Sequence, residues 1–407
     1  MDLPTLAPVI AKHGTPLYVY DWRVMKARIE SLSRFDVIRY AQKANSNTHI
    51  LRRMREASVV VDAVSPGELE RALAAGYQGG KDPAEVVYTA DIITPDVLER
   101  VVALNIPVNA GSIDMLDQVG KAKPGHPVWM RINPGFGHGH SRKTNTGGEW
   151  SKHGIWHQEL PRALEVIDRH GLDLVGLHVH IGSGTDFEHL RQVCDAMVGL
   201  VKEVGRDIRA ISGGGGLPIP YHGGEPFDTA ALFELWDQAR AQVADIVGHP
   251  VHLEIEPGRY LAGESGLLAA QVRAVKTVAG RRFVLVDAGF DNLVRPAMYG
   301  SYHRITVHGP DGALREDGAA PTVVAGPLCE SGDVFTQQEA GVVVPRELPA
   351  ARVGDLVVFH DAGAYASAMA SNYNSRPLAA EVLFDDGGAH LIRRRQTVDE
   401  LLALEAV

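Results

Sequence analysis

Several side chains that can do chemistry follow short apolar runs in this chain. Lys43 lies in the segment Tyr40–Asn45, where burial at the end of a strand is expected to favour the neutral amine. A neutral amine can form a Schiff base with a carbonyl compound, although a surface lysine that closes a strand is the plainer interpretation of this residue alone. His178 and His180 share one face of a strand. They fit a metal pair, a histidine stacked on an aromatic cofactor with Ser183 at its phosphate, or two buried core histidines.

A run of glycines and a later carboxylate add to this set. Gly213–Gly216 leaves backbone N–H groups unshielded, so it can cradle a phosphate, although glycines are also common in loops. The run is not a GxGxxG dinucleotide fingerprint, which disfavours NAD. Glu256 can hold a proton on a heterocyclic nitrogen, and Arg259 can join the phosphate site. A Schiff-base lysine, phosphate-binding glycines, a stacking histidine and this carboxylate together indicate pyridoxal 5′-phosphate.

Alternating strands and helices must position these side chains. Apolar, β-branched runs predict strands, and amphipathic stretches between them predict crossover helices, so we expect a parallel sheet. A closed (β/α)₈ barrel is favoured, because each run ends in a polar or charged residue and barrel enzymes carry their chemistry at that rim. The predicted strands are Asp36–Lys43, Val59–Val64, Val86–Thr89, Ile106–Asn109, Val128–Ile132, Leu174–His180, Ile208–Ser212 and Val251–Glu256. The predicted helices include Pro66–Ala75, Pro95–Leu104, Ile113–Lys121, Leu160–His170, Phe187–Val204 and Thr229–Val247.

The pattern changes after about residue 265, where strands follow one another without regular helices. Turn signals such as Pro310–Gly312 and Asp385–Gly388 separate them. We therefore predict an α/β protein with two domains. The barrel is expected over residues 26–265, and a mostly antiparallel β domain over residues 1–25 and 266–407. The predicted strands of the second domain are Leu267–Val278, Arg282–Asp287, Thr322–Ala325, Asp355–His360, Glu381–Phe384 and His390–Arg394, with Leu17–Tyr20 assignable to either domain.

Composition excludes several classes of protein. The chain has 407 residues, 45% of them hydrophobic, and 40 Lys and Arg against 50 Asp and Glu. This is ordinary globular composition, and the formal net charge of −10 argues against a general nucleic-acid or anionic-membrane binder. Two cysteines, Cys194 and Cys329, cannot build a disulfide scaffold. Without a secretion-type N-terminus or a spanning apolar run, a cytoplasmic location is expected.

Longer motifs make a family resemblance visible. The chain resembles the diaminopimelate decarboxylases, within the alanine-racemase-like, fold type III family of pyridoxal-phosphate enzymes. The motifs occur in the family's order and span nearly the whole chain; only GGGL would be unspecific alone. They are YAQKANSN (40–47), VDAVSPGELERALAAGY (61–77), HVHIGSG (178–184), GGGL (214–217), EPGR (256–259), VDAGFDNLVRPAMYGSYH (286–303), GPLCESGDVF (326–335) and DAGAYASAMASNYNSRP (361–377).

The resemblance implies a role for each matching residue. Lys43 holds the cofactor covalently, His180 stacks on its ring, and Glu256 pairs with the ring nitrogen. Cys329 is the proton donor, delivered from the partner subunit of a head-to-tail homodimer whose active sites are shared across the interface. The other expected cofactor contacts are Asp62, Ser183, Gly214, Gly215, Gly216, Pro257, Gly258, Arg259 and Tyr365. The expected substrate contacts are Arg259, Arg295, Tyr299, Glu330 and Tyr365.

The implied reaction is the decarboxylation of meso-2,6-diaminopimelate to L-lysine. Arg295 can bind a distal carboxylate in two-pronged fashion and Glu330 a distal ammonium, which suits the zwitterionic end of this substrate. Two alternatives stay open: a decarboxylase of a basic D-amino acid or polyamine precursor, and a non-catalytic pyridoxal-phosphate-binding relative. The long segment 133–155, which contains His138, His140, Lys143 and His153, is expected to be a lid rather than a metal site.

Overall fold

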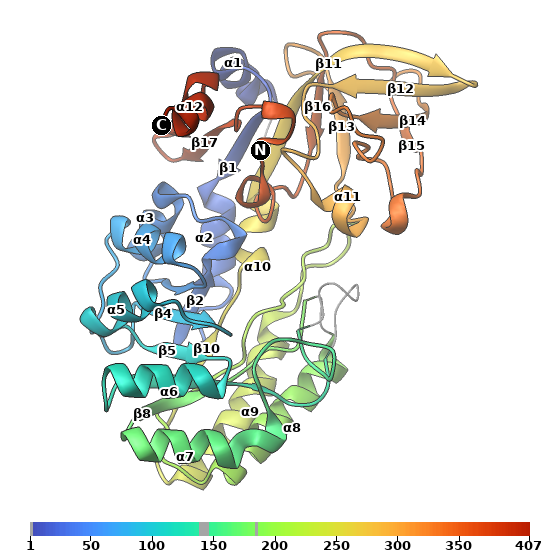
Figure 1. The fold of residues 1–407 in the computed structure, drawn as a ribbon. Coiled ribbons are helices and arrows are strands. Elements are labelled where there is room, and N and C mark those ends of the chain that lie inside the picture. The colour runs from blue at the N-terminus through green and yellow to red at the C-terminus, as the bar shows by residue number, and fades with distance from the viewer. Residues whose placement is uncertain (1–2, 138–145, 184–185) are drawn as a thin grey trace. The chain divides into compact units, whose positions relative to one another are not determined.

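The computed structural model describes residues 3–137, 146–183 and 186–407. The chain divides into two compact units (Figure 1). The barrel unit comprises Ala27–Ile219 and Pro226–Tyr260, and the β unit comprises Met1–Lys26, Pro220–Glu225 and Leu261–Val407. The sequence put the borders at residues 25/26 and 265/266. It did not separate the short segment Pro220–Glu225 from the barrel.

The strands of the barrel unit form a closed parallel barrel, as the sequence predicted. Within the described residues, eight strands pair in the order β2-β3-β4-β5-β6-β8-β9-β10, and β10 pairs again with β2. A short strand, β7 (Ile155–Trp156), adds to β6. The barrel strands are β2 (Val37–Ala41), β3 (Val60–Ala63), β4 (Val86–Ala90), β5 (Val108–Ala110), β6 (Pro127–Asn133), β8 (Asp173–Val179), β9 (Ala210–Ser212) and β10 (His252–Ile255).

Amphipathic helices connect these strands, and a side-chain cap begins α4 (Pro66–Ala74). Ser65 precedes this helix, and its hydroxyl accepts a hydrogen bond from the N–H of Glu68 at 3.2 Å. The Glu68 carboxylate reaches back to the N–H of Val64 at 2.9 Å, one residue earlier than in the usual capping box. The other helices of this unit are α3 (Thr48–Glu56), α5 (Pro95–Ala103), α6 (Ile113–Ala122), α7 (Leu160–His170), α8 (Phe187–Val204) and α9 (Thr229–Val247).

The strand register brings chemically important residues into one layer of the barrel. Arg131 in β6 pairs with His178 in β8, and His178 pairs with Ser212 in β9. Ser212 in turn pairs with Glu254 in β10, two residues before Glu256. Side chains that lie far apart in sequence therefore meet near the carboxyl ends of neighbouring strands, where barrel enzymes carry their chemistry.

The β unit is mostly antiparallel, as predicted, with parallel pairs between β1 and β17 and between β12 and β14. Figure 1 shows its long hairpin of β11 and β12. The sequence did not predict β13, β15 or α1. The strands are β1 (Leu17–Asp21), β11 (Gly266–Val278), β12 (Arg281–Val286), β13 (Ile305–His308), β14 (Ala320–Ala325), β15 (Arg346–Leu348), β16 (Leu356–Phe359), β17 (Ala380–Asp385) and β18 (Gly388–Arg393). The α-helices are α1 (Leu3–His13), α11 (Arg295–Tyr299) and α12 (Val398–Leu402), while α2 (Trp22–Glu30) and α10 (Arg259–Ala262) contain the unit borders.

Candidate active site

Lys43 lies just beyond the strand that was expected to end with it. Strand β2 ends at Ala41, and Lys43 sits in the 3₁₀ turn Gln42–Ala44. Its side chain is exposed, so the expectation that Lys43 is buried at the end of the strand was wrong. The tight turn takes Lys43 out of the barrel wall. The positive charge of Lys43 nonetheless acts on Asp62 and on His180, which places the amine at the same mouth of the barrel.

Glu256 is held as an ionised carboxylate by two neighbouring strands. Nε2 of His178 donates to Oε2 of Glu256 at 2.9 Å, and the hydroxyl of Ser212 donates to Oε1 at 2.8 Å. Burial alone would raise the pKa of Glu256, but the charge of His178 and these hydrogen bonds lower it to about 2. A carboxylate of this kind can keep a proton on a heterocyclic nitrogen, because it stays negative throughout the physiological range.

Asp62, near the end of β3, has the opposite electrostatics. Burial, and after it the negative charge of Glu256, raise the pKa of Asp62 to about 6, although a hydrogen bond with Thr89 and the charge of Lys43 act against the rise. Its Oδ1 is buried and has no hydrogen-bond partner among the described residues. Two nearby carboxyl groups thus have pKa values that are pushed apart, a feature of sites that handle protons.

The glycine run forms a turn that no other residue type could occupy. Gly214 and Gly216 have φ values of +61° and +93°, where side chains are disfavoured. A Cβ would lie 2.6 Å from the carbonyl oxygen of Val179 at Gly214, 2.3 Å from that of Glu256 at Gly215, and 2.2 Å from that of Gly182 at Gly216. The run therefore allows a close approach of backbone to backbone at the barrel mouth.

Three N–H groups of the run Gly213–Gly216 bond to the protein itself, and that of Gly213 donates to the carbonyl of Glu254 at 3.0 Å. That of Gly214 donates to the hydroxyl of Ser212 at 3.2 Å, and that of Gly215 to Nδ1 of His180 at 3.3 Å. Nδ1 of His180 is thus an acceptor, so it carries no proton and the ring is neutral. Burial, and then the charge of Arg131, lower the pKa of His180 well below its usual range. A neutral, flat imidazole is suited to stacking on an aromatic ring.

A cation and a hydroxyl meet beside the glycines. Nη2 of Arg259 lies 3.5 Å from the Ser183 hydroxyl, which it faces as a donor. Gly258 packs on the lysine turn, because a Cβ there would lie 3.0 Å from the carbonyl oxygen of Ala41, and Ala41 N–H donates to the carbonyl of Pro257. The EPGR segment therefore connects the phosphate-binding candidates to the turn that carries Lys43.

These residues fit pyridoxal phosphate on their own geometry. The buried, ionised Glu256 suits the ring nitrogen, and the neutral His180 suits the ring face. Arg259 and Ser183, next to a glycine turn without room for side chains, suit the phosphate, while the exposed amine of Lys43 suits the aldehyde. His178 and His180, for which a metal pair was one of three interpretations, contact different partners: Glu256 and the N–H of Gly215. Among the described residues, no group of three or more His, Cys, Asp or Glu side chains is arranged to hold a metal ion.

The described parts of the 133–155 segment are tied to the barrel rim. Oδ1 of Asn133 accepts the N–H groups of Gly135 and Gly148, and Nδ1 of His153 donates to Asp91 at 2.7 Å. Burial raises the pKa of Asp91, but the hydrogen bonds from His153 and Gly154 lower it overall. His138, His140 and Lys143 lie outside the described residues, so the prediction of a lid stays a prediction.

The expected substrate residues and Cys329 belong to the β unit. Cys329 and Glu330 are exposed, in the segment that follows β14. Arg295 begins α11 and is only 2% exposed. Tyr299 ends that helix and is half-buried, as is Tyr365, whose φ of +57° is unusual for a tyrosine.

Sequence reasoning missed the partners of Arg295. Nη1 of Arg295 donates to the Tyr221 hydroxyl at 2.9 Å and lies 3.0 Å from Nε2 of His303. The Tyr221 ring also lies under the guanidinium, 5.0 Å away. His303 is the last residue of the motif at 286–303, but nothing in the sequence links Arg295 to Tyr221, 74 positions earlier. Ser212, too, was noted only as a strand end, although it bonds both Glu256 and Gly214.

The barrel mouth and the lysine, glycine and carboxylate set define a pyridoxal-phosphate enzyme of the barrel type. The family model described as "Pyridoxal-dependent decarboxylase, pyridoxal binding domain" matches residues 23–263. A diaminopimelate decarboxylase of Streptomyces coelicolor is 64% identical over 100% of this chain and 92% of the relative, and one of Escherichia coli is 62% identical over 97% and 94%. A crystal structure of a diaminopimelate decarboxylase, 61% identical, superposes with a TM-score of 0.96 over 99% of this chain and 96% of that one.

A more distant solved structure, the Helicobacter pylori diaminopimelate decarboxylase complexed with L-lysine, has a TM-score of 0.85 at 30% identity and covers 98% of each chain. The chain therefore belongs to the diaminopimelate decarboxylase family of pyridoxal-dependent decarboxylases. Among the described residues, no helix is both long and apolar enough to cross a membrane.

Proposed function

We propose that this chain uses pyridoxal phosphate to decarboxylate meso-2,6-diaminopimelate to L-lysine and CO₂, the last step of lysine biosynthesis. The observation that carries the proposal is the buried Glu256, kept ionised by His178 and Ser212 at the mouth where Lys43 emerges. Relatives over 60% identical across the chain are named diaminopimelate decarboxylases, which supports the substrate.

The barrel residues bind and orient the cofactor. Lys43 would hold it covalently, and Asp62 would be a further contact of the cofactor. Glu256 keeps a proton on the ring nitrogen, and His180 lies on the ring face. Ser183, Arg259 and the turn Gly214–Gly216, with Pro257 and Gly258 behind it, enclose the phosphate.

The chemical step needs a place for electrons and a source of a proton. When bound, pyridoxal phosphate supplies an electron-accepting ring that stabilises the electron pair left on carbon as CO₂ departs. Glu256 sustains this by keeping the ring nitrogen positive. Cys329 then donates its thiol proton to that carbon, so a C–C bond is broken, a C–H bond is formed, and water returns the proton to the thiolate.

Substrate choice is assigned to Arg295, Tyr299 and Glu330. Arg295 binds the distal carboxylate and Glu330 the distal ammonium, and Tyr299 and Tyr365 line the same site. Nη1 of Arg295 donates to the Tyr221 hydroxyl and lies beside Nε2 of His303, and these contacts orient the guanidinium.

Two further parts of the proposal concern assembly and location. We propose a homodimer with shared active sites, in which Cys329 and Glu330 serve the barrel of the partner subunit. The exposure of both side chains is consistent with that role. The cytoplasmic location expected from the sequence stays a prediction.

Release of CO₂ by the purified enzyme with cofactor bound tests the proposal. The compounds offered in parallel are meso-diaminopimelate, L-lysine, L-ornithine, L-arginine and the D-isomers of the last three. We expect release from meso-diaminopimelate alone, with L-lysine as the product. Release from a basic D-amino acid instead would reassign Arg295 and Glu330, and no release from any compound would favour a non-catalytic relative.

A further inference from the structure

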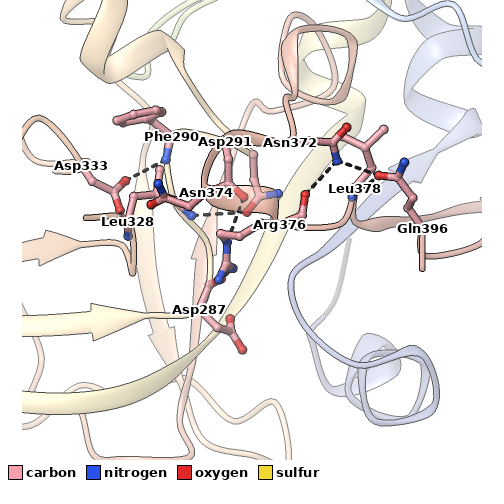
Figure 2. Close-up of polar contacts among 12 residues, drawn as sticks. Asp287, Phe290, Asp291, Leu328, Asp333, Asn372, Asn374, Arg376, Leu378 and Gln396 are labelled. Atoms are coloured by element: carbon pink, nitrogen blue, oxygen red, sulfur yellow. Dashed lines mark hydrogen bonds and ion pairs between the residues drawn. The ribbon is translucent and has the colours of Figure 1, made fainter. Parts of the chain in front are cut away.

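The segment that carries Cys329 is a tight turn with a buried carboxylate at its centre. Within the turn, the N–H of Glu330 donates to the carbonyl of Leu328 at 2.8 Å, and that of Asp333 to the carbonyl of Glu330 at 3.1 Å. The Asp333 carboxylate, in a residue only 4% exposed, accepts the N–H of Leu328 and the N–H of Phe290, both at 2.8 Å. Figure 2 shows Asp333 between Leu328 and Phe290. The base of the turn is thus fixed to the segment after β12.

Cys329 itself projects from this fixed base. It is exposed, so packing around its side chain does little to set its direction. Its backbone N–H donates to Oδ1 of Asn374 at 3.0 Å, a contact between residues 45 positions apart. This hydrogen bond joins the cysteine to a second loop and limits the rotation of the peptide plane that aims the thiol.

The loop that carries Asn374 has an unusual backbone. Asn374 and Ser375 have φ values of +54° and +55°, two successive residues in the left-handed region. Asparagine is among the side chains that tolerate this region best, and it also offers an amide oxygen for a hydrogen bond. Alanine would remove the acceptor and add backbone strain, so the two effects need separate variants.

Polar contacts fix this loop on both sides of Asn374. Nε of Arg376 donates to the carboxylate of Asp291 at 3.0 Å, and Nη2 of Arg376 donates to the carbonyl of Asp287 at 2.5 Å. Nδ2 of Asn372 donates to the carbonyl of Arg376 at 2.8 Å and to Oε1 of Gln396 at 2.7 Å. Figure 2 shows Asn372 and Arg376 with their contacts. The acceptor that meets Cys329 is therefore held in place before substrate binds.

We infer that Asn374 is a positioning residue for proton transfer, which it assists by fixing the backbone of Cys329. The inference rests on the proposed role of Cys329 as the proton donor. Proton transfer requires the donor at hydrogen-bond distance and in line with the carbon, and a displacement of about 1 Å can cost on the order of a hundredfold in rate. Asn374 acts through Cys329, so its loss should slow the proton step and leave substrate binding unchanged.

Two variants separate the acceptor from the backbone. Asn374→Gly removes the amide and keeps the left-handed backbone free of strain, while Asn374→Asp keeps an oxygen in the same place. Ser375→Gly is the matched control, because it loosens the same loop at a residue with no described hydrogen bond to Cys329. All are measured as holoenzyme with meso-diaminopimelate, in water and in deuterium oxide, together with amide hydrogen exchange of the peptide 328–331.

We expect Asn374→Gly to lower kcat by about 10- to 100-fold. Its KM and the absorbance of the bound cofactor should not change, while the solvent isotope effect on kcat rises and the Cys329 amide exchanges faster. Asn374→Asp should restore most of kcat, and Ser375→Gly should stay within about twofold of the parent.

Three results would overturn the inference. They are an unchanged exchange rate of the Cys329 amide in Asn374→Gly, an equal loss of kcat in Ser375→Gly, and a full kcat in Cys329→Ala. Failure of the proposed function looks different, because the parent enzyme would then release no CO₂ from meso-diaminopimelate while the exchange measurement still reported the contact between Asn374 and Cys329.

Discussion

Ser212→Ala is the sharpest test of the electrostatics at the barrel mouth. The Ser212 hydroxyl donates to the Glu256 carboxylate at 2.8 Å and accepts the N–H of Gly214 at 3.2 Å. Ser212 is 1% exposed and the side chain of Glu256 11% exposed, so water cannot readily replace the lost hydroxyl. Alanine keeps the shape of the strand end and removes both hydrogen bonds.

The unfolding free energy that Ser212→Ala should lose is large because one partner of the lost hydrogen bond, Glu256, is charged. A hydrogen bond to a charged group contributes about 1.5–3 kcal/mol, against about 0.5–1.5 kcal/mol for a neutral pair. Tyr77→Phe is the matched control in the same unit, because the Tyr77 hydroxyl is buried and its described hydrogen bonds go to the neutral carbonyls of Leu51 and Val59. Ser212→Ala should therefore cost about 1–2 kcal/mol more than Tyr77→Phe, a factor of roughly 5–30 in the unfolding equilibrium.

Urea unfolding of the apoprotein, followed by tryptophan fluorescence, measures this difference. Four of the five tryptophans (Trp129, Trp150, Trp156 and Trp236) lie in the barrel unit, so the signal reports mainly on the unit that contains Ser212. Only the differences between variants are compared, since a chain of two units need not unfold in a single step.

The pKa shifts of Glu256 and Asp62 determine how the cost of Ser212→Ala in unfolding free energy should change with pH. The pKa of folded Glu256, about 2, lies below its unfolded value, so its ionisation contributes stability that is complete above the unfolded pKa and is lost only as pH falls through the folded one. Between pH 7 and pH 5 the excess cost of Ser212→Ala should thus stay constant. The raised pKa of Asp62, about 6, makes the protein more stable as pH falls through 6, but parent and variant share this contribution.

Either of two results would refute this reasoning. If Ser212→Ala cost no more than Tyr77→Phe at pH 7, the hydroxyl would not be bonded to a charged group. If its excess cost fell by more than half between pH 7 and pH 5, Glu256 would be the carboxyl that takes up a proton in this window, and the assignment of the charge within the Asp62–Glu256 pair would be reversed.

Three further predictions concern the cofactor and substrate contacts. Lys43→Ala should abolish the absorbance band of the covalently held cofactor, and an unchanged spectrum would contradict the assignment of Lys43. Gly216→Ala should weaken pyridoxal-phosphate binding at least tenfold in an equilibrium titration, because its Cβ would lie 2.2 Å from the Gly182 oxygen at a φ of +93°; affinity equal to the parent's would contradict this. Tyr221→Phe should raise KM for meso-diaminopimelate by about fivefold and weaken inhibition by L-lysine equally, because it loosens Arg295. Inhibition by cadaverine, which has no carboxylate, should not change, and equal weakening of both inhibitors would remove Arg295 from the carboxylate site.

Much of the barrel was predictable because its signals are local. All eight predicted barrel strands are present, and the helix predicted over Pro66–Ala75 is found as α4 (Pro66–Ala74). The failures have local causes as well. Lys43 was expected inside the barrel wall because the apolar run seemed continuous, but the chain leaves β2 at Ala41 and turns. The short strands β13 and β15 were missed because three or four residues carry little periodicity.

The candidate site shows where sequence reasoning ends. Residue types at strand ends could be predicted, because parallel strands bring their carboxyl ends to one rim. Which of them touch depends on register around the closed barrel, and register is a property of the assembled sheet. Nothing in the sequence indicates that His178 contacts Glu256, 78 positions later. The contact arises because β8, β9 and β10 pair in a register that places His178 beside Ser212 and Ser212 beside Glu254.

That register also explains why His178 and His180, two residues apart, have different partners. His178 donates to the Glu256 carboxylate, and His180 accepts the N–H of Gly215 in the glycine turn. Ser212 links the Glu256 carboxylate to the glycine turn, because its hydroxyl donates to Glu256 and accepts the N–H of Gly214. The groups assigned to the ring nitrogen and to the phosphate are thereby joined through a single hydroxyl. A substitution at the ring-nitrogen end of the cofactor site should therefore alter the contacts at the phosphate end, and the reverse. Variants of Ser212 test this coupling directly.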